Sequence, residues 1–282
     1  MADALSADRV IVCPAFPGTG RSVYQGHLFV NDVLLSESGM QNHPLTPMTD
    51  ADLRRWLAPQ TRYQVGHVPA SAVFAGAEAI TKALDTEHAS GKNHIVVDAI
   101  RDEDLMVIGA AAADLPLVTG GSGVALGLPA NFSCQPGTPT WRGQDGPALV
   151  ISGSCSIATR GQVNFHKDRH NARELSAEDI VNDEFSPQEV LDWALSAGGI
   201  PLVYSSADPE VVAAIQERFG RDASAMAIEG FFSDLARLAV AAGITRIITA
   251  GGETSGAVVE ALGLESLAIG PEFDPGIPAL RA

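Results

Sequence analysis

The feature that most constrains the fold is an alternation of short, β-rich apolar runs with segments patterned as helices. This alternation is typical of α/β proteins, in which mostly parallel sheets are flanked by helices. The runs that predict strands are Arg9–Pro14, Val65–Val68, His94–Asp98, Leu115–Thr119, Ala148–Ser152, Ile200–Tyr204, Thr245–Ala250 and Ser266–Ile269.

Local signals predict helices between these runs. Thr49 precedes a helix expected over Asp50–Leu57, in which Asp52 places a carboxylate in the first turn. Ser186-Pro187-Gln188-Glu189 is a capping box with proline at the first helical position. The other expected helices run from Asp208-Pro209 to Gly220, over Ala223–Ala242 and over Ala257–Leu262.

The chain has 282 residues, which is enough for two domains of ordinary size. Between Gly127 and Gly146 the periodicity disappears and Pro, Gly and polar residues dominate, as in interdomain linkers. We therefore expect a first domain over residues 1–128, a linker over 129–146 and a second domain over 147–282.

Composition narrows the function classes. The net charge of −16 disfavours nucleic acid as a partner, because phosphate backbones are bound by cationic surfaces. The first residues lack the basic start and apolar run of a secretory signal, and no apolar run approaches the roughly 20 residues that span a bilayer. The three widely spaced cysteines match no metal motif. We expect a cytoplasmic protein without a membrane partner.

The segment Ala250-Gly251-Gly252-Glu253-Thr254-Ser255-Gly256-Ala257 follows a predicted strand and precedes a predicted helix. Glycines allow a ligand to approach the backbone closely, and a helix N-terminus favours phosphate. A capped tight turn is the alternative. The coincidence of glycines, hydroxyls and a carboxylate at a strand end favours a ligand site.

Two further turns have a related design. Ser152-Gly153-Ser154-Cys155-Ser156 follows the strand at Ala148–Ser152, and it is equally consistent with a phosphate cradle and with an ordinary helix cap. Thr119-Gly120-Gly121-Ser122-Gly123 follows another strand and either holds an anion or simply connects two elements.

In the first half, Arg21 follows a Pro/Gly turn at a strand end, where a guanidinium is suited to grip a carboxylate. His43 lies in a long polar loop, and Asp98 ends a strand, where it either bonds a sugar hydroxyl or caps the following helix. The sequence contains neither the P-loop motif nor the protein-kinase motifs. The residues alone indicate an α/β protein that binds a nucleotide or a phosphosugar.

Several segments together resemble the four-carbon acid sugar kinases, and most closely the branch that phosphorylates 3-oxo-tetronate. The resemblance covers nearly the whole chain. It is carried by Val12–Pro17 with Gly20-Arg21, Tyr24–Val30, His43–Asp50, Thr119–Gly123, Gly153–Ser156, Ala250–Gly256, Gly270–Glu272 and Asp274–Gly276.

This resemblance implies that the first domain binds the acid sugar and the second binds ATP with Mg²⁺, with the ligand cleft between them. Arg21 would face the substrate carboxylate, with His43 or Asp98 near its hydroxyls, and Glu253 would orient magnesium or a ribose hydroxyl. The positions carried over for ATP are Ser154, Gly251, Gly252, Glu253 and Thr254. A homodimer is compatible with this assignment.

The chain departs from the family pattern at both ends. It lacks the family's opening Asp-Asp-x-Thr-Gly loop and its closing Ser-Gly-Asn-Phe-Gly turn, so it is expected to be truncated and itself inactive, with the general base outside it. We therefore name no catalytic residue. The alternatives are a non-catalytic fragment that binds nucleotide and a phosphosugar isomerase or lyase.

Overall fold

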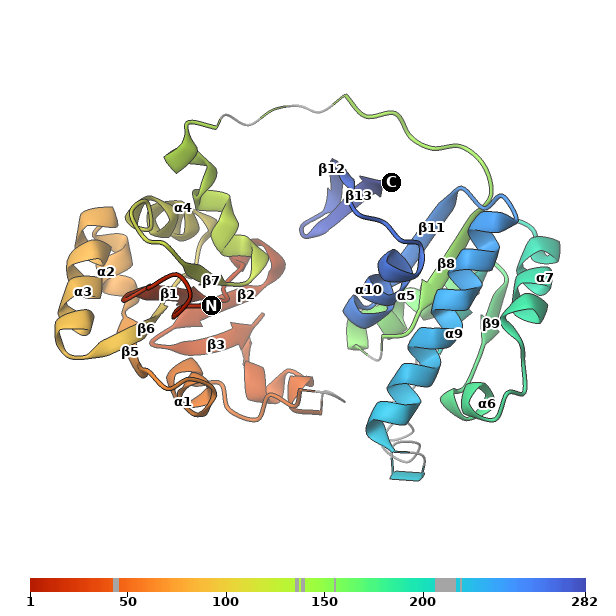
Figure 1. Cartoon of the computed structure of the whole chain (residues 1–282), viewed down its shortest axis with the longest axis horizontal. Coiled ribbons are helices and arrows are strands. Elements are labelled where there is room, and N and C mark those ends of the chain that lie inside the picture. Colours follow the sequence, from red (N-terminus) through yellow and green to blue (C-terminus); the bar gives the residue numbers. More distant parts are fainter. Residues whose placement is uncertain (43–45, 135–136, 138–139, 155, 206–216, 219) are drawn as a thin grey trace. The chain divides into compact units, whose positions relative to one another are not determined.

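The computed structural model describes residues 1–42, 46–134, 137, 140–154, 156–205, 217–218 and 220–282. It separates into two compact units, built mainly on Met1–Gln41 with Pro47–Pro139 and on Thr140–Gly270. Each unit has its own parallel sheet flanked by helices (Figure 1). The predicted fold class is therefore confirmed.

The first unit centres on a four-stranded sheet of order β5-β6-β1-β7. All neighbours in this sheet are parallel, and the apolar runs rich in Val and Ile suit a sheet that is buried on both faces. Its strands are β1 (Val10–Cys13), β5 (Gln64–Val68), β6 (Lys92–Val97) and β7 (Val118–Gly120). Its helices are α1 (Leu53–Leu57), α2 (Ala70–Phe74), α3 (Ala77–Ala89) and α4 (Asp102–Ala111).

A small antiparallel sheet in this unit was missed from the sequence. It contains β2 (Arg21–Tyr24), β3 (His27–Val30) and β4 (Val33–Leu34). The β2–β3 turn consists of Gln25 and Gly26, whose φ angles are +50° and +71°. Positive φ at both central residues is the backbone of a tight hairpin turn. Gln is an uncommon residue at positive φ, which is why the sequence did not predict this hairpin.

The second unit contains a parallel sheet of order β11-β8-β10-β9. Alternate residues along a strand point to opposite faces of the sheet, and helices cover both faces of this one. Leu149, Ile151 and Val203 join the core formed with α7 and α9, whereas Leu202 and Tyr204 pack with Val163 of α5. The strands are β8 (Ala148–Ser152), β9 (Ala172–Glu174), β10 (Leu202–Tyr204) and β11 (Arg246–Ala250), and the helices are α5 (Ile157–Lys167), α6 (Ala177–Val181), α7 (Pro187–Ala197), α9 (Arg221–Ala241) and α10 (Gly252–Ala261).

Of the predicted helix starts, that of α7 is confirmed and that of α1 is wrong. The capping box of α7 is confirmed, with Ser186 Oγ accepting from Glu189 N at 3.2 Å and Glu189 Oε2 accepting from Ser186 N at 2.8 Å. The predicted start of the helix after Thr49 is wrong: α1 begins at Leu53, because Asp52 caps it by accepting from Arg54 N. Most of the helix expected from Asp208 to Gly220 lies outside the described residues.

The chain ends in a hairpin of β12 (Ala268–Asp274) and β13 (Ile277–Arg281). The predicted strand Ser266–Ile269 overlaps only the start of β12. Within the described part of the chain, no helix combines the length and the apolar character needed to cross a bilayer.

Two glycines of the first unit are required by close packing. A Cβ on Gly109, inside α4, would lie 2.2 Å from the carbonyl carbon of Gly127. A Cβ on Gly127 would lie 2.3 Å from the carbonyl oxygen of Leu105. Since both close contacts are with backbone atoms, no side-chain rotation can relieve them.

We predict that Gly109→Ala destabilises the protein by about 1–3 kcal/mol despite the higher helix propensity of alanine, because the new methyl group overpacks this crossing. Gly161 of α5 is the matched control, since no atom lies within 4 Å of its Cβ position. Gly161→Ala should stabilise by about 0.5–1 kcal/mol. Urea unfolding followed by circular dichroism measures both changes, and a neutral or stabilising Gly109→Ala would contradict the packing argument.

Candidate functional site

The carboxyl ends of β8 and β11 bring two of the predicted turns together. Ser152 pairs with Ala250 at the ends of these parallel neighbours, and Gly153 N donates to Ala250 O at 3.1 Å. Because parallel strands end at the same edge of the sheet, Ser154 and the Gly251–Thr254 segment lie side by side. This edge is where ligands bind in open α/β sheets.

The glycines at this edge are needed for close packing. A Cβ on Gly153 would lie 2.4 Å from Thr254 Oγ1. Gly251 has φ of +117°, and its Cβ would lie 3.1 Å from Ser154 Cβ. Thr254 is buried. Thus the structure brings Ser154, Gly251 and Thr254 into one cluster.

The predicted boundary of the following helix is wrong, and the correction changes the chemistry of the turn. Helix α10 begins at Gly252 rather than at Ala257, so Gly252 and Glu253 are its first two residues. Both are exposed, and Gly251 supplies no side-chain cap. The N–H groups of a first helical turn have no acceptor within the helix, and they lie at the positive end of its dipole.

The hydroxyl groups near this helix start divide into occupied and free ones. Ser255 Oγ donates to Gly251 O at 2.7 Å, and Ser156 Oγ caps α5 by accepting from Thr159 N at 3.1 Å. Ser154 Oγ accepts from Ser156 N at 3.3 Å, and its own hydrogen has no acceptor among the described residues. Ser156 is therefore a cap, whereas Ser154 can donate to a ligand.

Sequence reasoning missed Ser205 at the same edge. It directly follows β10 and its N–H donates to Ser152 O at 2.9 Å. The side chain is buried, and among the described residues its hydroxyl has no hydrogen-bond partner. A serine immediately after a predicted strand was the available signal.

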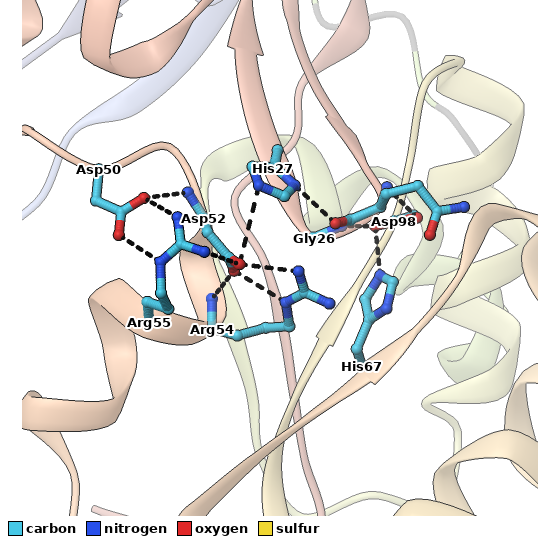
Figure 2. A network of polar contacts seen from close by, with 9 residues as sticks. Gly26, His27, Asp50, Asp52, Arg54, Arg55, His67 and Asp98 are labelled. Carbon is cyan, nitrogen blue, oxygen red and sulfur yellow. Dashed lines mark hydrogen bonds and ion pairs between the residues drawn. The ribbon is translucent and has the colours of Figure 1, made fainter.

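In the first unit, Asp98 is a fully buried acceptor at the end of β6 (Figure 2). Its Oδ1 accepts from Gly26 N and lies 2.9 Å from His67 Nε2. Its Oδ2 accepts from Gln25 N at 2.7 Å and Ala70 N at 3.0 Å. A carboxylate offers about four lone-pair sites, so these contacts leave none for a sugar hydroxyl.

The alternative interpretation of Asp98 as a cap for the following helix is wrong. The amides before α4 are held by Asp104, whose Oδ2 accepts from Ile100 N and Arg101 N, each at 3.0 Å. Asp98 therefore joins separate segments of the unit, the start of α2 among them, and does not cap α4.

A second carboxylate, Asp52, lies near this network (Figure 2). It is 3% exposed and accepts from the guanidinium of Arg54 at 2.9 and 2.8 Å and from Arg55 at 3.0 Å. His27 Nε2 lies 3.8 Å from its Oδ2. The hydrogen bonds from Arg54 are the main reason that the pKa of Asp52 is lowered to about 2.

The other predicted positions of the first half differ in their surroundings. Arg21 begins β2 and is exposed, and no hydrogen bond or ion pair of its guanidinium occurs within the described part of the chain. His43 lies outside the described residues. In the third glycine turn, Cβ atoms on Gly120 and Gly123 would lie 2.0 and 2.5 Å from the carbonyl oxygens of Cys13 and Ala15. This packing explains the glycines without an anion.

This edge combines the ends of a parallel sheet, a helix start without a side-chain cap and several glycines, an arrangement that suits phosphate groups in α/β proteins. Comparison with known proteins agrees with this class. Residues 1–128 match a family model described as a sugar-binding N-terminal domain, and residues 149–282 match one described as a nucleotide-binding C-terminal domain.

Curated relatives include a 3-oxo-tetronate kinase of Pseudomonas savastanoi, 43% identical over 98% of this chain and 66% of the relative. Another 3-oxo-tetronate kinase, from Haemophilus influenzae, is 39% identical over 99% of this chain and 69% of its own length. The chain thus spans about two thirds of these relatives.

Solved structures that are similar include a Haemophilus influenzae protein of the DUF1537 family, with a TM-score of 0.62 and 38% identity over 100% of this chain and 69% of that one. A Salmonella typhimurium protein gives a TM-score of 0.74 and 37% identity over 100% of this chain and 68% of its own. The chain belongs to the DUF1537 family, the four-carbon acid sugar kinases, and the resemblance inferred from the sequence is confirmed.

We predict that the Asp52 network makes stability depend on pH. The folded-state pKa of about 2 lies below the ordinary 3.8, so its contribution is full above about pH 4 and is lost as the pH falls through about 2. The lowered pKa of Asp52 contributes about 2 kcal/mol to the free energy of unfolding, because one pKa unit corresponds to about 1.4 kcal/mol.

Asp52→Asn tests this prediction, because the amide oxygen can still cap α1 while the charge is gone. Urea unfolding at pH 7 and at pH 3 should show a smaller pH dependence in the variant than in the unmodified protein. Equal pH dependence in both proteins would mean that Arg54 and Arg55 do not lower the pKa of Asp52 in the folded state.

Proposed function

We propose that this protein takes part in ATP-dependent phosphorylation of a four-carbon acid sugar, converting 3-oxo-tetronate into 3-oxo-tetronate 4-phosphate. The observation that carries the proposal is the exposed, uncapped start of α10 beside Ser154 at the carboxyl edge of the second sheet. The kinase names of the relatives and the description of the second family model support the same chemistry.

In this proposal the phosphates of ATP lie against the first turn of α10. The N–H groups of Gly252 and Glu253 and the hydroxyl of Ser154 donate to phosphate oxygens, while Gly251 lets the backbone approach. Thr254 does not contact the phosphates in this proposal but supports the turn by packing against Gly153. These groups bind and orient the nucleotide without changing protonation.

Mg²⁺ fits this edge through Glu253. Protein-bound Mg²⁺ commonly uses one or two carboxylates together with substrate phosphates. Glu253 is exposed and forms no ion pair within the described residues, and those residues contain no ready-made cluster of metal ligands. The alternative role for Glu253 is a hydrogen bond to a ribose hydroxyl. When bound, the metal would offset phosphate charge.

The acid sugar belongs to the first unit in this proposal. The guanidinium of Arg21 has no partner among the described residues, and its geometry matches that of a carboxylate. The reaction is in-line transfer of the γ-phosphoryl group to the terminal hydroxyl: the oxygen–phosphorus bond to ADP breaks as the bond to the sugar oxygen forms, and the hydroxyl group gives up its proton. The protein contributes mainly positioning and charge stabilisation.

We predict that Gly252→Val abolishes measurable ADP binding by the intact protein. The position has open space around its Cβ and no positive φ, so the fold should tolerate valine, but the branched side chain would stand where phosphate must approach. Isothermal titration calorimetry with ADP measures the loss.

Gly256→Val is the matched control for this experiment, because Gly256 lies one turn further along α10 and also has open space around it. It introduces the same side chain into the same helix and should retain ADP affinity. A folded Gly252→Val protein with unchanged affinity would sink the assignment of the phosphate site.

We also predict that Arg21→Ala weakens binding of erythronate or threonate, two stable four-carbon sugar acids, by roughly 10- to 100-fold. A charge-assisted hydrogen bond is worth about 1.5–3 kcal/mol. ADP affinity should not change. Lys82→Ala removes an exposed cation from α3 as the control. If both variants bind tetronates like the unmodified protein, Arg21 is not the carboxylate ligand.

A further inference from the structure

We propose that His67, held by the buried carboxylate of Asp98, accepts a hydrogen bond from a hydroxyl group of the acid sugar in the first unit. The proposal rests on the proposed function, and it names a ligand-binding residue that the sequence did not suggest. Its basis is the geometry around Asp98 shown in Figure 2.

The contacts of Asp98 determine which nitrogen of His67 carries hydrogen. Three of its four partners are backbone N–H groups, from Gln25, Gly26 and Ala70, so both carboxylate oxygens act as acceptors. His67 Nε2 is the fourth partner, at 2.9 Å. It must therefore donate, and the neutral imidazole then has its lone pair on Nδ1.

In the neutral ring Nδ1 is left as an acceptor. No hydrogen bond to it occurs within the described part of the chain, and it is not among the buried atoms that lack a partner. The His67 side chain is 15% exposed, whereas Asp98 is fully buried. The ring is thus anchored at one nitrogen and accessible at its edge.

The backbone at His67 is also held in place. Its N–H donates to Glu87 Oε2 of α3 at 3.2 Å, and Lys92 Nζ holds the same oxygen at 2.8 Å. Such support on a strand fixes the direction of the ring more firmly than a loop would. The guanidinium of Arg54 lies close to the β2–β3 turn that holds Asp98, since a Cβ on Gly26 would lie 2.8 Å from Arg54 Nε.

These features suit a hydroxylated anion. His67 lies at the carboxyl end of β5, next to the end of β6, at the edge of the sheet where α/β proteins bind ligands. A lone pair on Nδ1 attracts a hydroxyl donor and disfavours a carbonyl oxygen at the same place. A four-carbon sugar acid offers such hydroxyl groups.

The test measures binding of erythronate and threonate to the intact protein by calorimetry. His67→Phe keeps a ring of similar volume but removes the acceptor, and it should weaken both affinities roughly 3- to 10-fold, the range expected for one neutral hydrogen bond. ADP affinity should stay the same. Butanoate, which has no hydroxyl group, should bind the variant and the unmodified protein equally.

Two further variants separate binding from folding. His94→Phe is the control, since His94 lies on β6 of the same sheet and its buried Nδ1 has no partner among the described residues; it should not change tetronate affinity. His67→Gln, whose amide can both donate to Asp98 and accept from a hydroxyl, should recover part of the loss. If His67→Phe does not fold, His67→Asn, which is too short to join Asp98 to a ligand, carries the same expectation.

Unchanged erythronate and threonate affinity in folded His67→Phe, together with weakened binding in Arg21→Ala, would overturn the role of His67 and leave the proposed function standing. An unmodified protein that binds ADP but neither tetronate would overturn both. A loss in His67→Phe that is matched by an equal loss for butanoate would show a structural role instead.

Discussion

The first unit depends on one buried carboxylate. Burial of a charged group is costly unless hydrogen bonds compensate for it, and Asp98 receives four. Through them it joins the β2–β3 turn, the start of α2 and strand β5 to the end of β6. The bridge between Val23 and Ala99 then continues this attachment along β2. The small antiparallel sheet therefore has a defined place on the parallel one.

The sequence predicted the parts of the fold that follow from local pattern. Most strands of the two parallel sheets contain a short apolar run, and these were found because burial on both faces leaves little choice of residue. Strand β9 escaped detection, since Ala172-Arg173-Glu174 has no apolar run. The hairpin of β2 and β3 was missed for a different reason: Gln25 in its turn has positive φ, where Gln is uncommon, and its N–H donates to Asp98, which lies far away in sequence.

In the candidate sites too, features set by local sequence pattern were predicted, whereas features set by contacts between distant residues were not. Ser154, Gly251 and Thr254 were predicted because strand-end turns rich in Gly and Ser have a recognisable composition, and the adjacency of β8 and β11 brought them together. The start of α10 was misplaced, since two consecutive glycines resemble a turn more than a helix. His67 is separated from Asp98 by 31 positions, so only the pairing of β5 with β6 makes the two residues neighbours.

The attachment of Asp98 has a consequence for how this unit tolerates mutation. Three of the four groups that hold the carboxylate belong to the main chain, and every amino acid except proline supplies a backbone N–H. The side chains at positions 25 and 70 can therefore vary without removing a donor, although position 26 must remain glycine, given its φ of +71° and its contact with Arg54. The hydrogen bonds that make Asp98 an acceptor for His67 Nε2 thus depend mainly on the path of the backbone. Divergent sequences that keep this path would keep the same donor and acceptor nitrogens on the ring.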